Sequence, residues 1–310
     1  MKQMPVQIMK MAAFGWPNCY RISNGEVEAI VTSDIGPRIM RYGFVGGQNF
    51  MKEFKDQLGK SGEKDWQARG GHRLWISPED AVKTYAPDNG PIKVEVHGDA
   101  VESIEPVEPL TGLEKRITVK MAAEGSGIEI LHQIRNSGSA PYRLAPWALT
   151  MMAPGGAGIH GFPPRGTHPK DLAPTNPLVM WAYTNLSDPR WHLLRKYLVL
   201  VQDPNNPVPQ KLGSFNPWTW GAYLKNSELF VKRARAEGTP EEYPDYGCSF
   251  EMFTNNEFLE LETVGRLVTL QPGQSVNHTE NWSLHKNVRV PHWTDDELDR
   301  SGAIPGTVAR

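Results

Sequence analysis

The sequence predicts an all-β protein, a large antiparallel β-sandwich with few short helices, and three observations support this prediction. Proline occurs 26 times and glycine 29 times in 310 residues, so turn-forming residues punctuate the chain densely. Between them lie short segments rich in β-branched and aromatic residues, in which apolar and polar residues alternate. No segment sustains a helical period over several turns, and many short strands at regular spacing are typical of a sandwich.

The predicted strands can be followed in order along the chain. The first is GEVEAIVTSDIG, residues 25–36, in which Val27, Ala29 and Val31 share one side. Residues 220–234 contain KNSE, a sequence that suits the connection between the two strands of a hairpin. The same alternation predicts strands within residues 92–98, 115–123, 128–136, 142–153, 197–203, 258–270 and 275–285.

Helices and long loops are expected at only a few places. The best candidates for short helices are residues 51–59 and the acidic residues 294–300. Two proline-rich loops, residues 153–178 and 203–218, are expected to lie over one face of the sandwich. Loops of this length are usually functional or disordered, and their Trp, His and Phe content favours a functional cover.

Length and charge restrict the classes of partner. A chain of 310 residues can bury a sizeable core, and we expect one domain, residues 1–310, with a peripheral tail from about 294 to 310. Lys and Arg number 33 against 35 Asp and Glu, for a formal net charge of -2. Because no broad positive field is available, neither nucleic acid nor an anionic membrane is expected as a partner. The oligomeric state does not follow from the sequence.

The N-terminus and the cysteines favour a cytoplasmic location. The opening MKQMPVQIMKMAAFGWPNCY is a poor signal peptide because Pro5, Gln7 and Lys10 interrupt its apolar residues. Cys19 and Cys248 lie far apart without a metal-binding spacing, which fits a reducing compartment. The longest apolar run, YLVLV, is far shorter than the roughly 20 residues of a membrane-spanning helix.

Known cofactor motifs do not occur. The glycine-rich GGAGIHG, residues 155–161, lacks the strand-to-helix context of a phosphate-binding loop, which disfavours hydride and phosphoryl transfer. His72 with Glu79, or His278 with Glu280, could ligate an ion, but neither pair has a recognised ligand spacing. The prediction is therefore a protein with no cofactor and no metal.

The first candidate site is RGGHRLWISPE, residues 69–79. Arg69, His72, Arg73, Trp75 and Glu79 crowd around a glycine pair. An aromatic ring beside charged groups suits a sugar, because the ring stacks on its C–H face and the charges pair with hydroxyls. The structural alternative is a turn whose histidine satisfies a backbone carbonyl and whose Trp belongs to the core.

The second candidate lies within residues 247–274. On an extended strand Phe258, Glu260 and Glu262 share one face, and Glu251 belongs to the same neighbourhood. Two carboxylates about 7 Å apart on one strand face raise each other's pKa, which poises a general base. The alternative is a plain solvent-exposed edge.

Two further residues are weaker candidates. Trp147 lies in a predicted strand that runs into a glycine-rich loop, where a core position is the default for a lone Trp. Lys232 can point inward beside apolar residues, and a surface lysine with a buried stem is the equal alternative.

Three pieces of the sequence together resemble the galactose mutarotase-like (aldose 1-epimerase-like) superfamily, in a bacterial branch distinct from mutarotase proper. They are NGEVEAIVTSDIGPRIMRYGF, RGGHRLWISPE and FLELETVGRLVTLQPGQSVNHTENWSLH, in matching order along nearly the whole chain. The resemblance implies a β-supersandwich of the galactose mutarotase type that binds pyranoses on a concave face. By position in LET, Glu262 resembles the family's catalytic carboxylate. Arg69 stands where the family has a histidine before the glycine pair, and Trp147 where it has the acid histidine.

The leading hypothesis is an enzyme with aldose 1-epimerase-like chemistry at a sugar's anomeric or adjacent carbon. Glu262 is its expected base and His72 its expected acid. The sugar, suggested by the cations to be acidic or oxidised, is expected to contact Arg69, Arg73, Trp75, Glu79, Trp147, Lys232, Glu251 and Glu260. The alternative is a non-catalytic carbohydrate-binding or sensing protein, and a weaker one is a glycan lyase or hydrolase on a similar sandwich.

Overall fold

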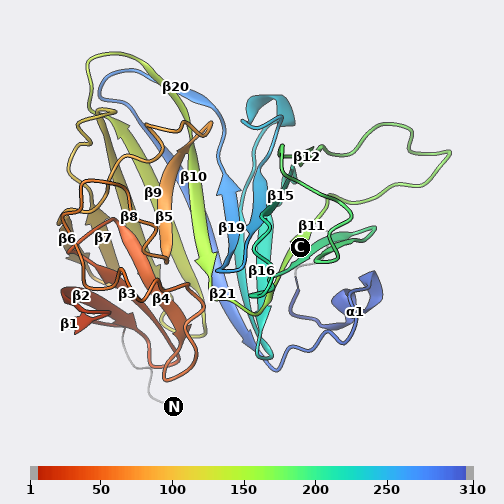
Figure 1. Cartoon of the computed structure of the whole chain (residues 1–310), viewed down its shortest axis with the longest axis horizontal. Helices are drawn as coiled ribbons and strands as arrows, with labels where there is room; N and C mark the ends of the chain where they lie inside the picture. The colour runs from red at the N-terminus through yellow and green to blue at the C-terminus, as the bar shows by residue number, and fades with distance from the viewer. Residues whose placement is uncertain (1–5, 305–310) are drawn as a thin grey trace. The chain divides into compact units, whose positions relative to one another are not determined.

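The computed structural model describes residues 6–304, which form 21 strands, one 3-10 helix and one short α-helix (Figure 1). The strand pairs are antiparallel, as in the ladders that join β2 to β3 and β8 to β9. The predicted all-β antiparallel fold is therefore confirmed. None of the helices within residues 6–304 has the length and apolar character needed to cross a lipid bilayer.

The chain divides into two compact units, each of which is described by itself. Unit 1 comprises Met1–Met151 and Leu267–Trp282, and unit 2 comprises Met152–Arg266 and Ser283–Arg310. The expectation of a single domain stays a prediction.

Unit 1 contains strands of two sheets. The first has the order β1-β2-β3-β4-β5-β10, with β20 also pairing with β10. The second has the order β21-β9-β8-β7-β6. The strands of the first are β1 (Gln7–Ala13), β2 (Trp16–Ser23), β3 (Val27–Thr32), β4 (Arg38–Phe44), β5 (His72–Ser77), β10 (Tyr142–Met152) and β20 (Val268–Leu270). Those of the second are β6 (Lys93–His97), β7 (Ala100–Ile104), β8 (Leu113–Met121), β9 (Ile128–Asn136) and β21 (Ser275–Lys286).

The alternation of residues in these strands creates the core of unit 1. In β9, Ile128, Ile130, His132 and Ile134 are buried while the residues between them are more exposed. Strand β5 contacts β8, so the inner faces of the two sheets meet there. Two of the core positions of β9 and β21, His132 and Glu280, carry polar side chains, which is unusual for a sandwich interior.

Unit 2 contains a second set of strands. Strands β19-β18-β15-β12 lie in one sheet and β13-β14-β11-β16-β17 in the other. The first four are β12 (Leu178–Met180), β15 (Gln210–Ser214), β18 (Phe250–Thr254) and β19 (Leu259–Val264). The others are β11 (Ala157–Gly161), β13 (Trp191–Leu193), β14 (Tyr197–Val201), β16 (Trp220–Lys225) and β17 (Glu228–Ala234), with η1 (Pro240–Glu242) and α1 (Asp295–Arg300) outside the sheets.

The two layers of unit 2 meet closely at glycines. Strand β19 packs against β11 and β16. A Cβ atom on Gly158 would lie 2.5 Å from the Met252 sulfur, and one on Gly221 would lie 2.4 Å from the Phe250 ring. The glycine-rich GGAGIHG therefore contains a packed strand, because only glycine lets the layers approach so closely.

Several sequence predictions need correction. Residues 51–59 form turns rather than a helix, because the Lys52 N–H donates to the Met151 carbonyl and Gly59 has a φ of 71°. The predicted helix near residue 294 is confirmed as α1, but the segment is not peripheral, since Leu298 and Ile304 lie in a core cluster of unit 2. The rest of the predicted tail, residues 305–310, lies outside the described residues.

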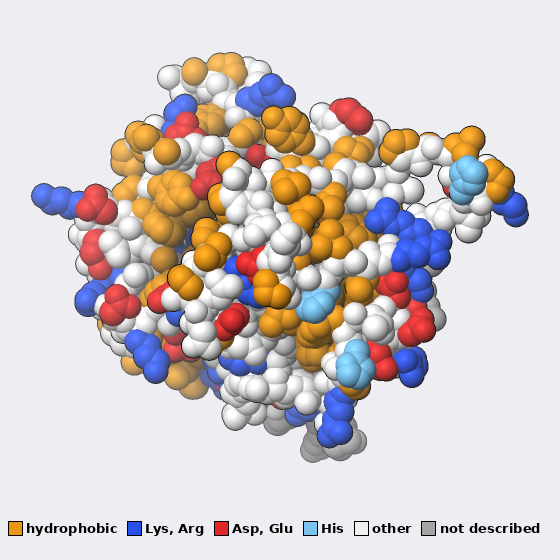
Figure 2. Space-filling view, turned by 45° about the vertical axis from the view of Figure 1, so that its right-hand side comes forward, with side chains coloured by type: hydrophobic (Ala, Val, Ile, Leu, Met, Phe, Trp, Pro, Cys, Tyr) orange, Lys and Arg blue, Asp and Glu red, His pale blue; other side chains and the backbone are white. Residues whose placement is uncertain are grey.

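Each predicted long loop contains a strand. Strand β11 lies within residues 153–178, and β15 lies within 203–218. The segment between β11 and β12 extends away from the strands of unit 2 (Figure 1). Its projecting end carries hydrophobic, histidine and Lys or Arg side chains (Figure 2), and Leu172 within it is 75% exposed.

Candidate functional site

The glycine pair fixes how the chain enters β5. Gly70 and Gly71 have φ angles of 89° and 74°, which favour glycine. A Cβ atom on Gly70 would lie 1.9 Å from the Lys52 carbonyl oxygen. The register that follows pairs His72 with Thr150 on β10. His72 then points to one face of β5, whereas Arg73 and Trp75 point to the other, because successive strand residues alternate.

Aromatic rings and one arginine gather on the second of these faces. We call this group the aromatic cluster, and it consists of Trp66, Arg73, Trp75, Tyr85 and Trp147. The Arg73 guanidinium carbon lies 4.1 Å from the Trp75 ring centroid and 5.3 Å from that of Trp66. Trp75 and Trp147 are paired across the strands with ring centroids 5.5 Å apart, and the Tyr85 ring lies 4.8 Å from Trp75. The structure thus brings together three of the predicted sugar-contacting residues.

The other two members of the first sequence motif are engaged elsewhere. Arg69 is fully buried, and its guanidinium donates to the Gln57 carbonyl oxygen at 2.7 Å, pairs with Glu63 and contacts Asn89. Glu79 is exposed and accepts a hydrogen bond of 2.5 Å from the Tyr85 hydroxyl. Arg69 therefore joins loops to one another, while Glu79 lies at the edge of the aromatic cluster.

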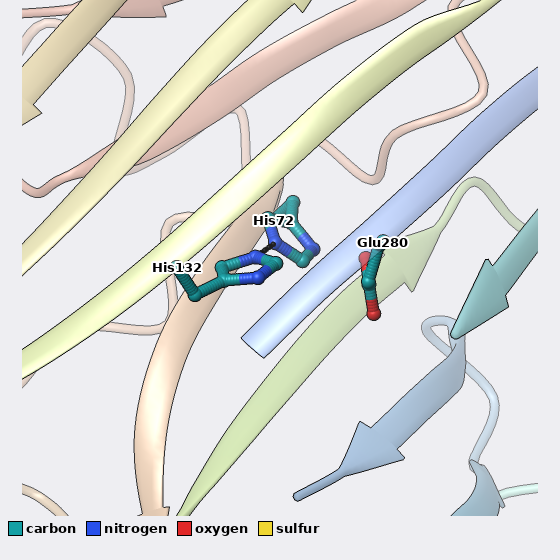
Figure 3. Close-up of side chains that lie close together, drawn as sticks. All are labelled: His72, His132 and Glu280. Carbon is teal, nitrogen blue, oxygen red and sulfur yellow. Dashed lines mark hydrogen bonds between the residues drawn. The ribbon is translucent and has the colours of Figure 1, made fainter. Parts of the chain in front are cut away.

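His72 belongs to a separate group inside unit 1. This histidine–glutamate cluster consists of His72 on β5, His132 on β9 and Glu280 on β21, all fully buried (Figure 3). The Nε2 atoms of His72 and His132 lie 2.7 Å apart. One ligand atom from each of the three side chains lies within 4.8 Å of the others, so the cluster could hold a metal ion. The His72 ring faces away from the aromatic cluster, and the acid role expected of this residue stays a prediction.

A third group lies in unit 2 and contains the predicted base. The acid–lysine cluster consists of Lys211 on β15, Glu251 on β18 and Glu262 on β19, each at most 5% exposed at its side chain. Glu251 and Glu262 are directly paired across neighbouring strands. The Lys211 ammonium lies 2.7 Å from Glu251 Oε2 and donates to Glu262 Oε2 at 2.9 Å. The single cation therefore bridges two carboxylates.

Burial and charge set the protonation of this cluster. Burial is the largest effect on Glu251 and raises its pKa well above the ordinary value, and the nearby Glu262 raises it further against the opposing effect of Lys211. Burial alone would lower the pKa of Lys211, but the two carboxylates outweigh this effect and raise it well above the ordinary value. The directions of these two shifts favour a charged Lys211 and a protonated Glu251.

Trp181 lies against the Lys211 ammonium of the acid–lysine cluster. Its ring centroid lies 4.6 Å from Lys211 Nζ, and Gly213 leaves room for the ring, because a Cβ atom there would lie 3.2 Å from it. The backbone N–H of Trp181 donates to the Thr184 hydroxyl, and this hydroxyl donates to the Lys211 carbonyl oxygen at 2.5 Å. This short segment is therefore anchored directly to β15.

The remaining candidates lie on β17 and β19. Glu260 is 7% exposed and shares the face of Glu262, which confirms the predicted alternation of β19. Leu261 points to the opposite side, toward β11 and β16. Lys232 is fully buried, which agrees with the interpretation that it points inward and not with that of a surface lysine. Its ammonium donates to the Leu261 carbonyl oxygen at 3.0 Å.

Sequence reasoning missed five residues in or beside these groups: Lys211, Trp181, His132, Trp66 and Tyr85. Lys211 and Trp181 lie in or beside segments interpreted as loops. His132 carried a usable signal, since it occupies a core position of a correctly predicted strand whose other inward residues are isoleucines. No local pattern identifies Trp66.

No family model matches the sequence, and no curated protein matches it. Among solved structures, a galactose mutarotase related enzyme from Lactobacillus acidophilus is similar, with a TM-score of 0.52, 9% identity and coverage of 87% of this chain and 98% of its own. A galactose mutarotase-like protein from Clostridium acetobutylicum has a TM-score of 0.51 at 10% identity, covering 91% and 99%. The Slr1438 protein of Synechocystis has a TM-score of 0.57 at 12% identity, covering 90% and 100%. These likenesses establish a galactose mutarotase-like β-sandwich fold and nothing finer.

Proposed function

We propose that the protein binds a pyranose at the acid–lysine cluster and catalyses aldose 1-epimerase-like exchange at its anomeric carbon. The observation that supports this proposal is the pairing of Glu251 with Glu262 across one shared lysine. Environments that drive two carboxyl groups to opposite protonation states supply an acid and a base side by side. The fold, shared with a galactose mutarotase related enzyme, is consistent with sugar chemistry.

The proposed reaction uses both carboxyl groups. The Glu262 carboxylate takes the proton of the anomeric hydroxyl, while protonated Glu251 donates its proton to the ring oxygen. The C1–O5 bond breaks, the aldehyde carbon rotates, and the reverse proton transfers close the ring as the other anomer. Lys211 stays charged throughout and orients both carboxyl groups. Glu251 thereby takes the acid role that the sequence suggested for His72.

Access to the cluster depends on Trp181. Because Glu251 and Glu262 are at most 1% exposed, side chains around the cluster must move before a sugar can reach them, and the Trp181 ring beside Lys211 is proposed to be one of them. The displaced indole can then stack on the C–H face of the pyranose. The anchored segment around Trp181 therefore acts as a cover in the proposed cycle.

Polarimetry of anomer equilibration tests this proposal. Freshly dissolved neutral aldoses and uronic acids are mixed with the wild type, Glu262→Gln and Glu251→Gln. Acceleration by the wild type that falls at least about 100-fold in both variants is expected for the loss of an acid or a base. Glu129→Gln, at an exposed position, is the control and should keep the wild-type rate. No acceleration of any sugar by the wild type, or full activity of Glu262→Gln, contradicts the proposal.

A non-catalytic carbohydrate-binding function is the second candidate, and the grouping of Arg73 with Trp75 and Trp147 favours it. In this case the sugar stacks on the aromatic cluster, and Arg73 selects acidic sugars over neutral ones. Calorimetric binding without anomer exchange, weakened by Trp147→Ala and unaffected by Glu262→Gln, is the result that distinguishes it. A preference for neutral hexoses would contradict the role of Arg73.

A further inference from the structure

We propose that His72, His132 and Glu280 form a binding site for a divalent transition metal of the zinc type inside unit 1. This site is separate from the acid–lysine cluster and does not depend on the sugar chemistry. Two imidazoles and one carboxylate are a ligand set that Zn²⁺ accepts, with one further position for a small ligand such as water. The three side chains come from β5, β9 and β21 (Figure 3), which lie far apart in the sequence, so no local spacing of ligands predicts this site.

The ligand atoms already converge. One ligand atom of each residue lies within 4.8 Å of the other two. The Nε2 atoms of the histidines are 2.7 Å apart, whereas two nitrogens bound to one tetrahedral zinc at about 2.0–2.1 Å lie roughly 3.3 Å apart. Metal binding therefore requires the two Nε2 atoms to move apart by roughly half an ångström, which small rotations of the side chains can achieve.

The outer nitrogens determine which atoms face the ion. His132 Nδ1 lies 2.8 Å from the His278 carbonyl oxygen, so Nδ1 carries the proton and Nε2 of a neutral ring offers its lone pair. His72 Nδ1 lies 2.9 Å from the Thr150 hydroxyl, which can either donate or accept. The 2.7 Å contact then has His72 Nε2–H donating to His132. A metal ion takes the place of this proton between the rings, and the proton moves to His72 Nδ1, from which the Thr150 hydroxyl then accepts.

Further contacts orient the ligands as in known metal sites. Metal-bound histidines usually donate their other ring N–H to a carbonyl, a hydroxyl or a carboxylate, and both rings here have such a partner. The Trp282 indole N–H donates to Glu280 Oε2 at 2.7 Å, which fixes the carboxylate. The Trp282 ring also packs edge-on against His72 with centroids 4.8 Å apart. These contacts hold the side chains in place before an ion arrives.

Complete burial indicates a structural ion rather than a catalytic one. All three side chains have no exposed surface, so the site lies in the interior of unit 1. We infer that the bound ion would join β5 to β9 and β21 and stabilise unit 1.

Metal titration of the full chain tests the site. Protein stripped with a chelator is titrated with ZnCl₂ by calorimetry, and Co²⁺ is added in parallel to record its visible spectrum. We expect one tight ion per chain, an intense four-coordinate Co²⁺ spectrum, and a melting temperature raised by about 5 °C at 100-fold excess over the dissociation constant. His132→Gln and Glu280→Gln should each lose the tight ion.

An exposed group provides the matched control. Glu95, His97 and Glu102 also offer ligand atoms within reach of one ion, at the surface of β6 and β7. His97→Ala removes that group and should leave tight binding and the Co²⁺ spectrum unchanged. If tight binding is instead lost in His97→Ala and kept in His132→Gln, the proposal is wrong.

Two measurements remain decisive should the ligand variants fail to fold. Thr150→Val keeps the ligands but removes the partner of His72 Nδ1, and we expect affinity for Zn²⁺ about 10-fold weaker. X-ray absorption of the wild type with Zn²⁺ should show two imidazoles on the ion. Absence of tight binding by the wild type, or an ion without histidine ligands, overturns the proposal.

Discussion

The histidine–glutamate cluster of unit 1 and the acid–lysine cluster of unit 2 differ in the way their charge is arranged. Each brings three polar side chains from three strands into a buried position. In unit 2 the carboxylates surround a lysine of the protein itself, Lys211. In unit 1 imidazole nitrogens and a carboxylate converge on one another, with a hydroxyl, a carbonyl and an indole N–H behind them.

This difference shows that a buried glutamate can have different chemistry in the two clusters, depending on its neighbours. A cluster that contains its own cation fixes the protonation of its acids, as general acid/base chemistry requires. A cluster of converging lone pairs has the character of a ligand shell. Residue type alone therefore does not assign a role to a buried glutamate, and the identity of its neighbours does.

The largest effect is expected from removing the cation of unit 2. Lys211→Met leaves two buried carboxylates without their shared ammonium, and breaking such a pair costs about 3–5 kcal/mol. Chemical denaturation at neutral pH measures the free energy of unfolding. Lys93→Met is the control because the Lys93 side chain is 70% exposed. An equal loss in the two variants would show that Lys211 does not stabilise the cluster.

The second prediction concerns the pH dependence that Glu251 creates. Its pKa is raised in the folded state, so the unfolded chain loses this proton first and wild-type stability falls as the pH rises above the unfolded pKa. Glu251→Gln removes this loss. The variant should therefore gain on the wild type by up to about 1.4 kcal/mol per pH unit as the pH rises above the unfolded pKa of Glu251, measured by denaturation. Parallel curves would contradict the protonation assigned to Glu251.

The third prediction concerns His160, a buried histidine of unit 2 that can be compared with the buried histidines of the histidine–glutamate cluster. In unit 2, burial lowers the pKa of His160 to about 4, although its Nδ1 donates to the Trp220 carbonyl at 2.8 Å. The unfolded chain then binds the proton first as the pH falls below about 6.5, and stability decreases. From pH 7 to pH 5 this contribution amounts to about 2 kcal/mol. His160→Phe should reduce the decrease by that amount, and an unchanged pH slope would assign it to other groups.

The sequence predicted the fold better than the sites. Period-two alternation identified about half of the strands, among them β8, β9 and β21, in which buried and more exposed residues alternate. Strands β11 and β15 were missed because glycines and a lysine interrupt that pattern, and close packing between layers is not visible in a local window. Glu251 and Glu262 were predicted together and are in fact paired. His72 and Trp75 were assigned to one candidate site, although residues three apart on a strand face opposite sides.

The most direct test of the central claim asks which tryptophan a sugar contacts. In ¹⁵N-indole NMR spectra of the full chain, single Trp→Phe substitutions assign the resonances of Trp181, Trp75 and Trp147. Each sugar of the polarimetric panel is then added to the wild type. Binding at the acid–lysine cluster predicts that an active sugar shifts the Trp181 resonance, and that Glu262→Gln alters this response. Shifts of Trp75 and Trp147 with Trp181 unchanged would contradict it.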